Sequence, residues 1–285
     1  DIMELLFQVS EKISKKLPVV NITDINAAIT LANKTIEDCA ARNISISFVE
    51  SSADCIWKSR FSSIPNPPLI LYTLGNTEIL NGPTIAIIGT RQPTLWGEKS
   101  ATRFAEVSVH HGFCVVSGLA FGCDIAAHKG ALIANTNGNT VSVLAHGLDS
   151  VHPKKHSRIA SEIIDKGGCL MSEYPPGVGP EPRNFVERDR LQSAASLGVI
   201  VVETTINGGS MHTVRFAQKQ NRYVSCIDHP VKFHNLESTK GNRELLNDGA
   251  YAIKNGEDLE QFLKLCSESI KSAYQNTSQQ TDLFK

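Results

Sequence analysis

Several features that mark other classes of protein are absent from this sequence. No apolar run approaches the ~20 residues that a membrane span requires. Residues 1–16 carry acids and lysines at helical spacing and lack the apolar core of a signal peptide. The seven cysteines are scattered without a CxxC pair, so neither a disulfide framework nor a zinc site is indicated. We expect a cytoplasmic protein without a metal site or membrane association.

Two common nucleotide-binding signatures are also missing. The sequence contains neither a GxGxxG motif nor the Walker lysine motif, so a dinucleotide cofactor or an NTPase site lacks its fingerprint. Asp124, Glu173 and Glu203 stand near the ends of apolar segments, yet no Ser/His/Asp or paired-carboxylate spacing can be established. We therefore expect no catalytic residues and no cofactor.

The chain as a whole does not carry the excess positive charge that is common in nucleic-acid-binding domains. The formal net charge is −1, whereas nucleic-acid-binding domains often have a pI above ~9. Any binding of DNA must therefore depend on local clusters of basic residues.

Apolar segments alternate with amphipathic helical segments through most of the chain. Strands are expected at 85–88, 113–116, 140–144, 169–175, 198–203 and 223–227, and the last of these is expected to be the final strand of the series. Helices are expected at 98–111, 124–134 and 157–166, and from the loop at 208–210 through residue 220. This alternation predicts an α/β fold with a mostly parallel, doubly wound sheet. We expect an N-terminal helical accessory segment at 1–47, a main domain at 48–264 and a flexible tail at 265–285, with an edge strand at 44–48.

Glycine-rich loops follow three of the expected strands. Because the carboxyl ends of parallel strands meet at one edge of a sheet, these loops are expected to border one crevice. Glycine lets the backbone approach an anion, hydroxyl and helix N-terminal N–H groups donate to it, and arginine suits phosphate. One such loop would more often be only a tight turn, but three at one edge favour a phosphate-binding rim. The residues expected there are Gly89, Thr90, Arg91, Ser117, Gly118, Gly122, Gly208, Gly209 and Ser210.

Two basic clusters lie outside these loops. The segment 183–190 carries Arg183, Arg188 and Arg190. The alternative is a solvated helix face on which Glu187 pairs with Arg190 and Asp189 also pairs, and the presence of Asp189 partly supports it. Lys154 and Lys155 stand at a helix start, where basic residues oppose the helix dipole. Their position there indicates an anionic partner.

Taken together, these loops resemble the DNA-processing protein A family (DprA, also called Smf). The similarity covers about 44–263 and rests on motifs that are weak singly and specific in combination. It implies an extended Rossmann-like domain that binds single-stranded DNA, forms a homodimer and helps to load a RecA-type recombinase. In the family, the arginine of the first loop and the basic residues near 185–190 line the DNA pocket, which assigns Arg91, Arg188 and Arg190 here. The motifs are 89–91, 117–124 with 126–128, 147–149, 172–175, 185–190 and 208–211.

The sequence departs from the family pattern at two places. Where the family has Arg-Asn-Arg, this chain has Arg188-Asp189-Arg190, which places a carboxylate beside the expected pocket. This carboxylate either weakens DNA binding or orients both arginines. The winged-helix domain common at the family's C-terminus is not recognisable. The chain instead ends in a segment similar to peptides that bind the β sliding clamp, with Gln280, Leu283 and Phe284 as the expected contacts. The alternative is a frayed helix end that packs back on the protein.

The sequence thus predicts a non-catalytic, single-stranded DNA-binding protein of the DprA type. A second hypothesis is a sensor or enzyme of the same Rossmann-like superfamily whose crevice holds a free nucleotide. A nucleotide needs one pocket, whereas a DNA strand needs an extended track of positive surface. The process served, whether transformation, plasmid maintenance or phage defence, stays open at this point.

Overall fold

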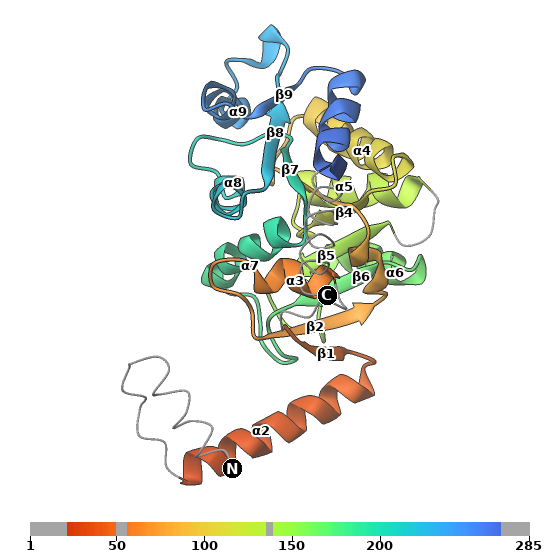
Figure 1. Cartoon of the computed structure of the whole chain (residues 1–285), viewed down its shortest axis with the longest axis vertical. Helices are drawn as coiled ribbons and strands as arrows, with labels where there is room; N and C mark the ends of the chain where they lie inside the picture. The colour runs from red at the N-terminus through yellow and green to blue at the C-terminus, as the bar shows by residue number, and fades with distance from the viewer. Residues whose placement is uncertain (1–21, 50–55, 135–138, 269–285) are drawn as a thin grey trace, which may run out of the picture.

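The computed structural model describes residues 22–49, 56–134 and 139–268. Within them the chain forms a nine-stranded sheet in the order β1-β2-β6-β5-β4-β3-β7-β8-β9 (Figure 1). The predicted α/β fold is confirmed. The strands are β1 (Ser45–Phe48), β2 (Ile70–Gly75), β3 (Thr84–Ile88), β4 (Cys114–Ser117), β5 (Thr140–Leu144), β6 (Cys169–Ser172), β7 (Gly198–Val201), β8 (Tyr223–Ile227) and β9 (Tyr251–Ile253).

Seven neighbouring strands of this sheet, β3 to β9, run parallel. The order β5-β4-β3-β7-β8-β9 is the Rossmann arrangement, in which the chain fills the sheet outward from β3 in two directions. Strands β2 and β1 extend the sheet beyond β6 in antiparallel pairing, and β1 is the predicted edge strand. The prediction that the series closes with 223–227 is wrong, because β9 pairs with β8 beyond it.

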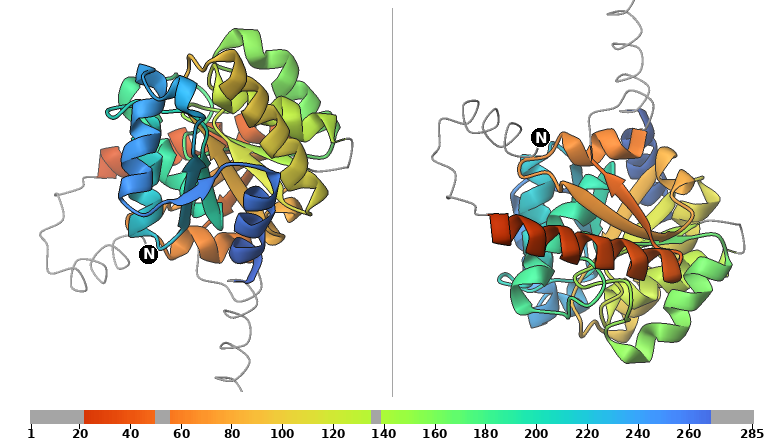
Figure 2. Two further views of the ribbon diagram at one scale, coloured as in Figure 1. Left: turned by 90° about the horizontal axis from the view of Figure 1, so that it is seen from above. Right: turned by 90° about the horizontal axis from the view of Figure 1, so that it is seen from below.

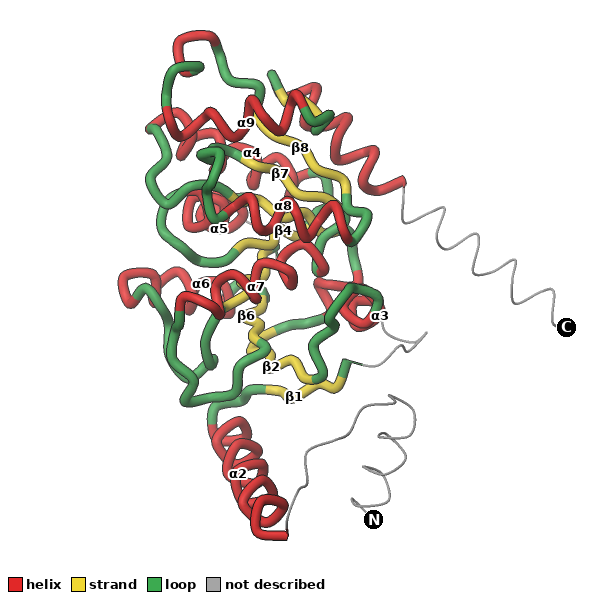
Figure 3. Tube along the Cα trace, turned by 90° about the vertical axis from the view of Figure 1, so that its left-hand side faces the viewer, coloured by secondary structure: helices red, strands yellow, loops and turns green. Residues whose placement is uncertain are grey.

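Helices cover both faces of the sheet (Figure 2). One face carries α4 (Leu95–His110), α5 (Cys123–Ile133), α6 (Ser157–Asp165) and the helix at 256–268. The other carries α3 (Ile56–Ser62), α7 (Pro182–Ala194), α8 (Ser210–Lys219) and α9 (Glu237–Asn247). The N-terminal helical layer is α2 (Ile22–Ala41), which extends away from the sheet (Figures 1 and 3). Short 3-10 turns are η1 (Glu78–Asn81), η2 (Lys154–His156) and η3 (Val231–Phe233).

Strand β3 is buried along its whole length between the two helical layers. Successive strand side chains point to opposite faces, so Ile85 and Ile87 join one core while Ala86 and Ile88 join the other. The residues of β3 must therefore be apolar on both faces of the strand. Among the described residues, no helix combines the length and apolar character needed to cross a membrane.

Candidate nucleic-acid interface

The carboxyl ends of β3, β4 and β7 border a cleft of about 480 Å³. β3 pairs with β4 on one side and β7 on the other, so the cleft lies where the strand order reverses. α7 and the start of α8 complete its walls. The glycines of the loops after β3 and β7 line the cleft as predicted, whereas Gly118 and Gly122 of the third loop do not line it. The lining includes Gly89, Arg91, Asp124, Arg188, Gly209 and Ser210.

The loops after β3 and β4 are packed tightly against each other. The carbonyl of Thr90 accepts a hydrogen bond from the N–H of Cys123 at 3.2 Å, and the N–H of Thr90 donates to the carbonyl of Glu203 at 2.7 Å. Gly122 has a φ of 77°, and a Cβ there would collide with the Thr90 carbonyl. Glycine at 122 is thus needed for backbone packing, and this contact fixes the position of Arg91.

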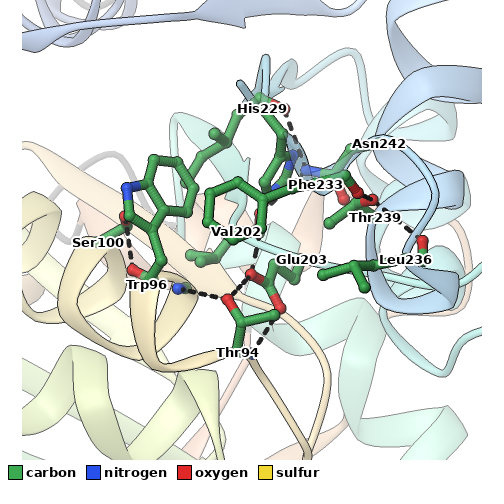
Figure 4. A network of polar contacts seen from close by, with 12 residues as sticks. Thr94, Trp96, Ser100, Val202, Glu203, His229, Phe233, Leu236, Thr239 and Asn242 are labelled. Carbon is green, nitrogen blue, oxygen red and sulfur yellow. Dashed lines mark hydrogen bonds and ion pairs between the residues drawn. The ribbon is translucent and has the colours of Figure 1, made fainter. Parts of the chain in front are cut away.

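A buried carboxylate joins the β3 loop to the β7 loop (Figure 4). Glu203 is fully buried and accepts from the N–H of Thr94 at 2.9 Å and from its hydroxyl at 2.6 Å. Thr94 caps the start of α4, where its hydroxyl oxygen accepts from the N–H of Gly97 at 3.0 Å. His229, from the loop after β8, lies 3.8 Å from Glu203, and its ring contacts Trp96 with centroids 5.3 Å apart. Burial lowers the pKa of His229 to about 4, so the ring is neutral at physiological pH.

A row of cationic and aromatic groups leads out of the cleft. The guanidinium of the exposed Arg91 lies 5.2 Å from the ring centroid of Phe185, a cation–π distance. Phe185 lies 6.4 Å from the ring of His152, whose ring is 6.3 Å from that of His146. His152 is exposed in the loop after β5, so the row connects three chain segments that are distant in sequence.

Arg188 and Arg190 are buried, and neither extends freely into solvent. Arg188 donates to the carbonyl of Val143 at 2.6 Å, although part of it still lines the cleft. Arg190 donates to both carboxylate oxygens of Glu173 at 2.7 Å. The expected pair of Glu187 and Arg190 is wrong, because Glu173 takes that role, whereas the expected pairing of Asp189 is seen with Arg188.

Two carboxyl groups stand against Arg188. Asp124 accepts from the N–H of Gly118 at 3.1 Å, and burial raises its pKa despite the nearby Arg188. Asp189 lies 3.3 Å from Arg188 Nε, and its side chain is 13% exposed. Burial raises the pKa of Asp189 to about 7, with Arg188 and Arg91 opposing the rise and Asp124 adding to it. The surroundings of Asp189 in the folded protein therefore favour its protonated form more than water does.

The structure brings together some of the predicted residues and separates others. The Ser117 hydroxyl donates to the carbonyl of Ile87 at 2.7 Å in the buried interior, so it does not face an anion. Lys154 and Lys155 are exposed on η2 and Arg183 on α7, all three outside the cleft lining. Residues Gln280, Leu283 and Phe284 lie outside the described part of the chain.

Sequence reasoning missed the contribution of Gln192 to the cleft. With its amide oriented to satisfy both atoms, its oxygen accepts from the N–H of Gly118 at 2.8 Å and from Arg188 Nη1 at 3.2 Å. Its nitrogen then donates to Asp189 Oδ1 at 3.3 Å. The available signal was spacing, because Gln192 follows Arg188 by four residues and so shares its helix face.

An extended Rossmann-like sheet with an arginine-bearing cleft at its switch point defines the class of this protein. Residues 49–264 match the family model of DNA recombination-mediator protein A, and the chain belongs to that family. It is 33% identical over 210 residues to Protein Smf of Escherichia coli, covering 74% of this chain and 55% of that protein. It spans about half the length of this relative and of Protein Smf of Synechocystis, of which it covers 47%.

Two solved structures support the assignment. DNA processing protein A of Streptococcus pneumoniae matches with a TM-score of 0.73 and 25% identity over 90% of each chain. The protein of the same name from Helicobacter pylori matches with a TM-score of 0.66 and 30% identity, over 79% of this chain and 97% of that one. The latter structure is described as giving insight into that protein's single-stranded DNA binding mode.

Proposed function

We propose that the cleft and the row beside it bind single-stranded DNA, and that the protein is a non-catalytic mediator of DNA recombination. The observation that carries this proposal is the contact series from Arg91 through Phe185 to His152. The series ends near the exposed Lys154 and Lys155, which follow His152 closely in sequence and begin η2. Phosphates and bases of one strand need such alternating positive and aromatic groups over several nucleotides. The Helicobacter pylori relative supports the choice of ligand.

A free nucleotide in the cleft is the second candidate function. The cleft volume of about 480 Å³ lies within the ~300–1,000 Å³ common for small-molecule sites. The N–H groups at the start of α8 suit one phosphate group. The two candidates differ outside the cleft, since a single nucleotide has no use for the exposed lysines of η2.

We extend the proposal to partners on the strength of the family assignment and the resemblance. The protein is proposed to form a homodimer in the cytoplasm and to pass bound DNA to a RecA-type recombinase. The clamp proposal rests on sequence alone. Calorimetry of a peptide of residues 276–285 with purified β clamp tests it, and changing Leu283 and Phe284 to alanine should abolish the heat of binding.

A salt titration separates the two candidate functions. The affinity for a labelled single-stranded oligonucleotide should fall with salt, with a log–log slope of about −0.7 for each phosphate contact. Lys155→Ala should reduce both the affinity and the slope. Lys264→Ala is the matched control, because this exposed lysine shares a hollow with Pro83 and Phe113, at the amino ends of β3 and β4. A flat salt dependence together with tight binding of a free nucleotide would favour the second candidate.

A further inference from the structure

Helix α2, which extends away from the sheet (Figure 3), carries a largely exposed apolar stripe. Within α2 only Cys39 is buried, while Ile22 is 71% and Ile36 55% exposed. Single apolar side chains on a surface are normal, but an aligned stripe along a helix marks a contact face. The members of the stripe recur at spacings of three and four residues and are Ile22, Ile25, Ile29, Ala32 and Ile36.

The stripe continues into the core of the domain. Cys39 follows Ile36 at the same helical spacing and packs in a buried cluster with Ile44 and Tyr72. The face by which α2 joins the domain is thus the face that stays exposed toward its start. A segment lying along the stripe would extend this core.

The sequence directly before α2 carries a matching stripe. Between residues 2 and 13, apolar residues recur at spacings of four, three and four, which suits one face of a helix. Residues 17–21 separate this segment from α2, and they include Pro18, which favours a helix end before it. A connection of this length is usual between antiparallel helices. The matching stripe consists of Ile2, Leu6, Val9 and Ile13.

We propose that residues 2–16 form a helix that docks antiparallel on the stripe of α2, so that the chain begins with an αα-hairpin. One register serves the whole contact, because the spacings in the first stripe, taken backwards, repeat those of the second. Glu4, Glu11 and Lys15 fall outside the contact in this register, as charged residues should. The pairs that face each other are Ile13 with Ile25, Val9 with Ile29, Leu6 with Ala32 and Ile2 with Ile36.

The other candidate occupant is α2 of a second copy of the chain. An antiparallel pair of α2 helices would place Ile22 of the copy against Cys39, which is already buried in its own domain. Residues 2–16 also have an advantage in concentration. A short link gives an effective concentration of about a millimolar, whereas a second copy competes only at the concentration of the protein.

Oxidative cross-linking of the full chain tests the register. Two double variants join residues that face each other: Ile2→Cys with Ile36→Cys, and Val9→Cys with Ile29→Cys. Exchanging the partners gives two control variants built from the same four substitutions, Ile2→Cys with Ile29→Cys and Val9→Cys with Ile36→Cys. The exchange displaces each pair by one heptad, about 10.5 Å along the helix. Since a disulfide needs Cα atoms within about 7 Å, the facing pairs should cross-link at least about tenfold faster than the exchanged pairs.

Isotope labelling identifies the occupant of the stripe. Unlabelled and nitrogen-15-labelled protein are mixed before oxidation, and the linked peptides are identified by mass. We expect peptides whose two halves carry the same label. Halves of different label would place a second copy on the stripe and overturn the inference, as would equal rates for facing and exchanged pairs or no cross-link in either. DNA affinity plays no part in this readout, so the result is independent of the proposed function.

Discussion

Arg188 donates a 2.6 Å hydrogen bond to the backbone carbonyl of Val143, which ties α7 to the carboxyl end of β5. A Cβ on Gly118 would collide with the Arg188 guanidinium, so the bare backbone at 118 makes room for this bond. The arginine that sequence reasoning assigned to the DNA phosphates thus has a structural partner inside the protein. It contributes positive charge to the cleft from a fixed position.

Arg190→Ala should destabilise the fold by about 2–3 kcal/mol, because it leaves the Glu173 carboxylate without its partner. The expected cost is below that of a fully buried pair, since the Glu173 side chain is 25% exposed. Arg183→Ala on the same helix is the matched control, and this exposed residue should change stability by no more than about 0.5 kcal/mol. Urea unfolding of both variants measures the difference. Equal stabilities would show that the Glu173 pair contributes nothing.

Arg91→Ala should weaken single-stranded DNA binding by about 1.5–3 kcal/mol, the usual contribution of a charge-assisted hydrogen bond. Its stability should stay unchanged, because the side chain is exposed above Phe185. Arg42→Ala provides the control, because this exposed arginine precedes the edge strand β1, whereas Arg91 follows the central strand β3. The measurement is anisotropy at fixed salt. A folded Arg91→Ala protein with wild-type affinity would remove Arg91 from the interface.

Asp189 should make the unliganded protein less stable as the pH rises through 7. Its folded-state pKa of about 7 lies above the ordinary value of 3.8, so the stabilising form is the protonated one. That contribution is complete below about pH 4 and lost as the pH passes through 7. Asp189→Asn should therefore be more stable than the wild type at pH 8.5, by about 1–3 kcal/mol, with the gap closing toward pH 4. Denaturant unfolding across this pH range measures the gap, and a pH-independent gap would contradict the raised pKa.

Glu203→Gln should destabilise the protein by about 1.5–3 kcal/mol, because the amide cannot accept from both the N–H and the hydroxyl of Thr94 as the carboxylate does. DNA affinity should fall as well, since the loop carrying Arg91 loses its side-chain attachment to Glu203 and keeps only the backbone bond from the Thr90 N–H. Thr94→Ser keeps both donors and serves as the control. A variant with weakened DNA binding and unchanged stability would indicate a direct role of Glu203 in binding.

Much of the fold follows from local sequence pattern. β5 and β8 were predicted at their observed bounds, because short apolar runs limited by polar residues leave little choice of register. The sequence also predicted that the glycine loops lie close together, because parallel strands place their carboxyl ends at the same edge of the sheet. β9 was missed because Tyr251–Ile253 is too short to form a recognisable apolar run.

The orientation of the α7 arginines could be predicted only in part. Residues 188 and 190 are two apart on a helix and do not share a face, so at most one could point into the cleft. Which partner each one meets depends on the carbonyl of Val143 and the carboxylate of Glu173, both distant in sequence. The pKa of Asp189 likewise follows from burial and from Asp124, which no local pattern encodes.

The reversal of strand order at β3 divides the sheet between two stretches of chain. Strands β3 to β6 occupy residues 84–172, and β7 to β9 occupy residues 198–253, with α7 as the covalent link between them. A DNA strand in the cleft would contact Arg91 from the first stretch and Ser210 from the second. Bound DNA then couples the two stretches a second time, so that neither can open without losing the ligand. We expect the cooperativity of unfolding, and not only its midpoint, to rise when the cleft is occupied.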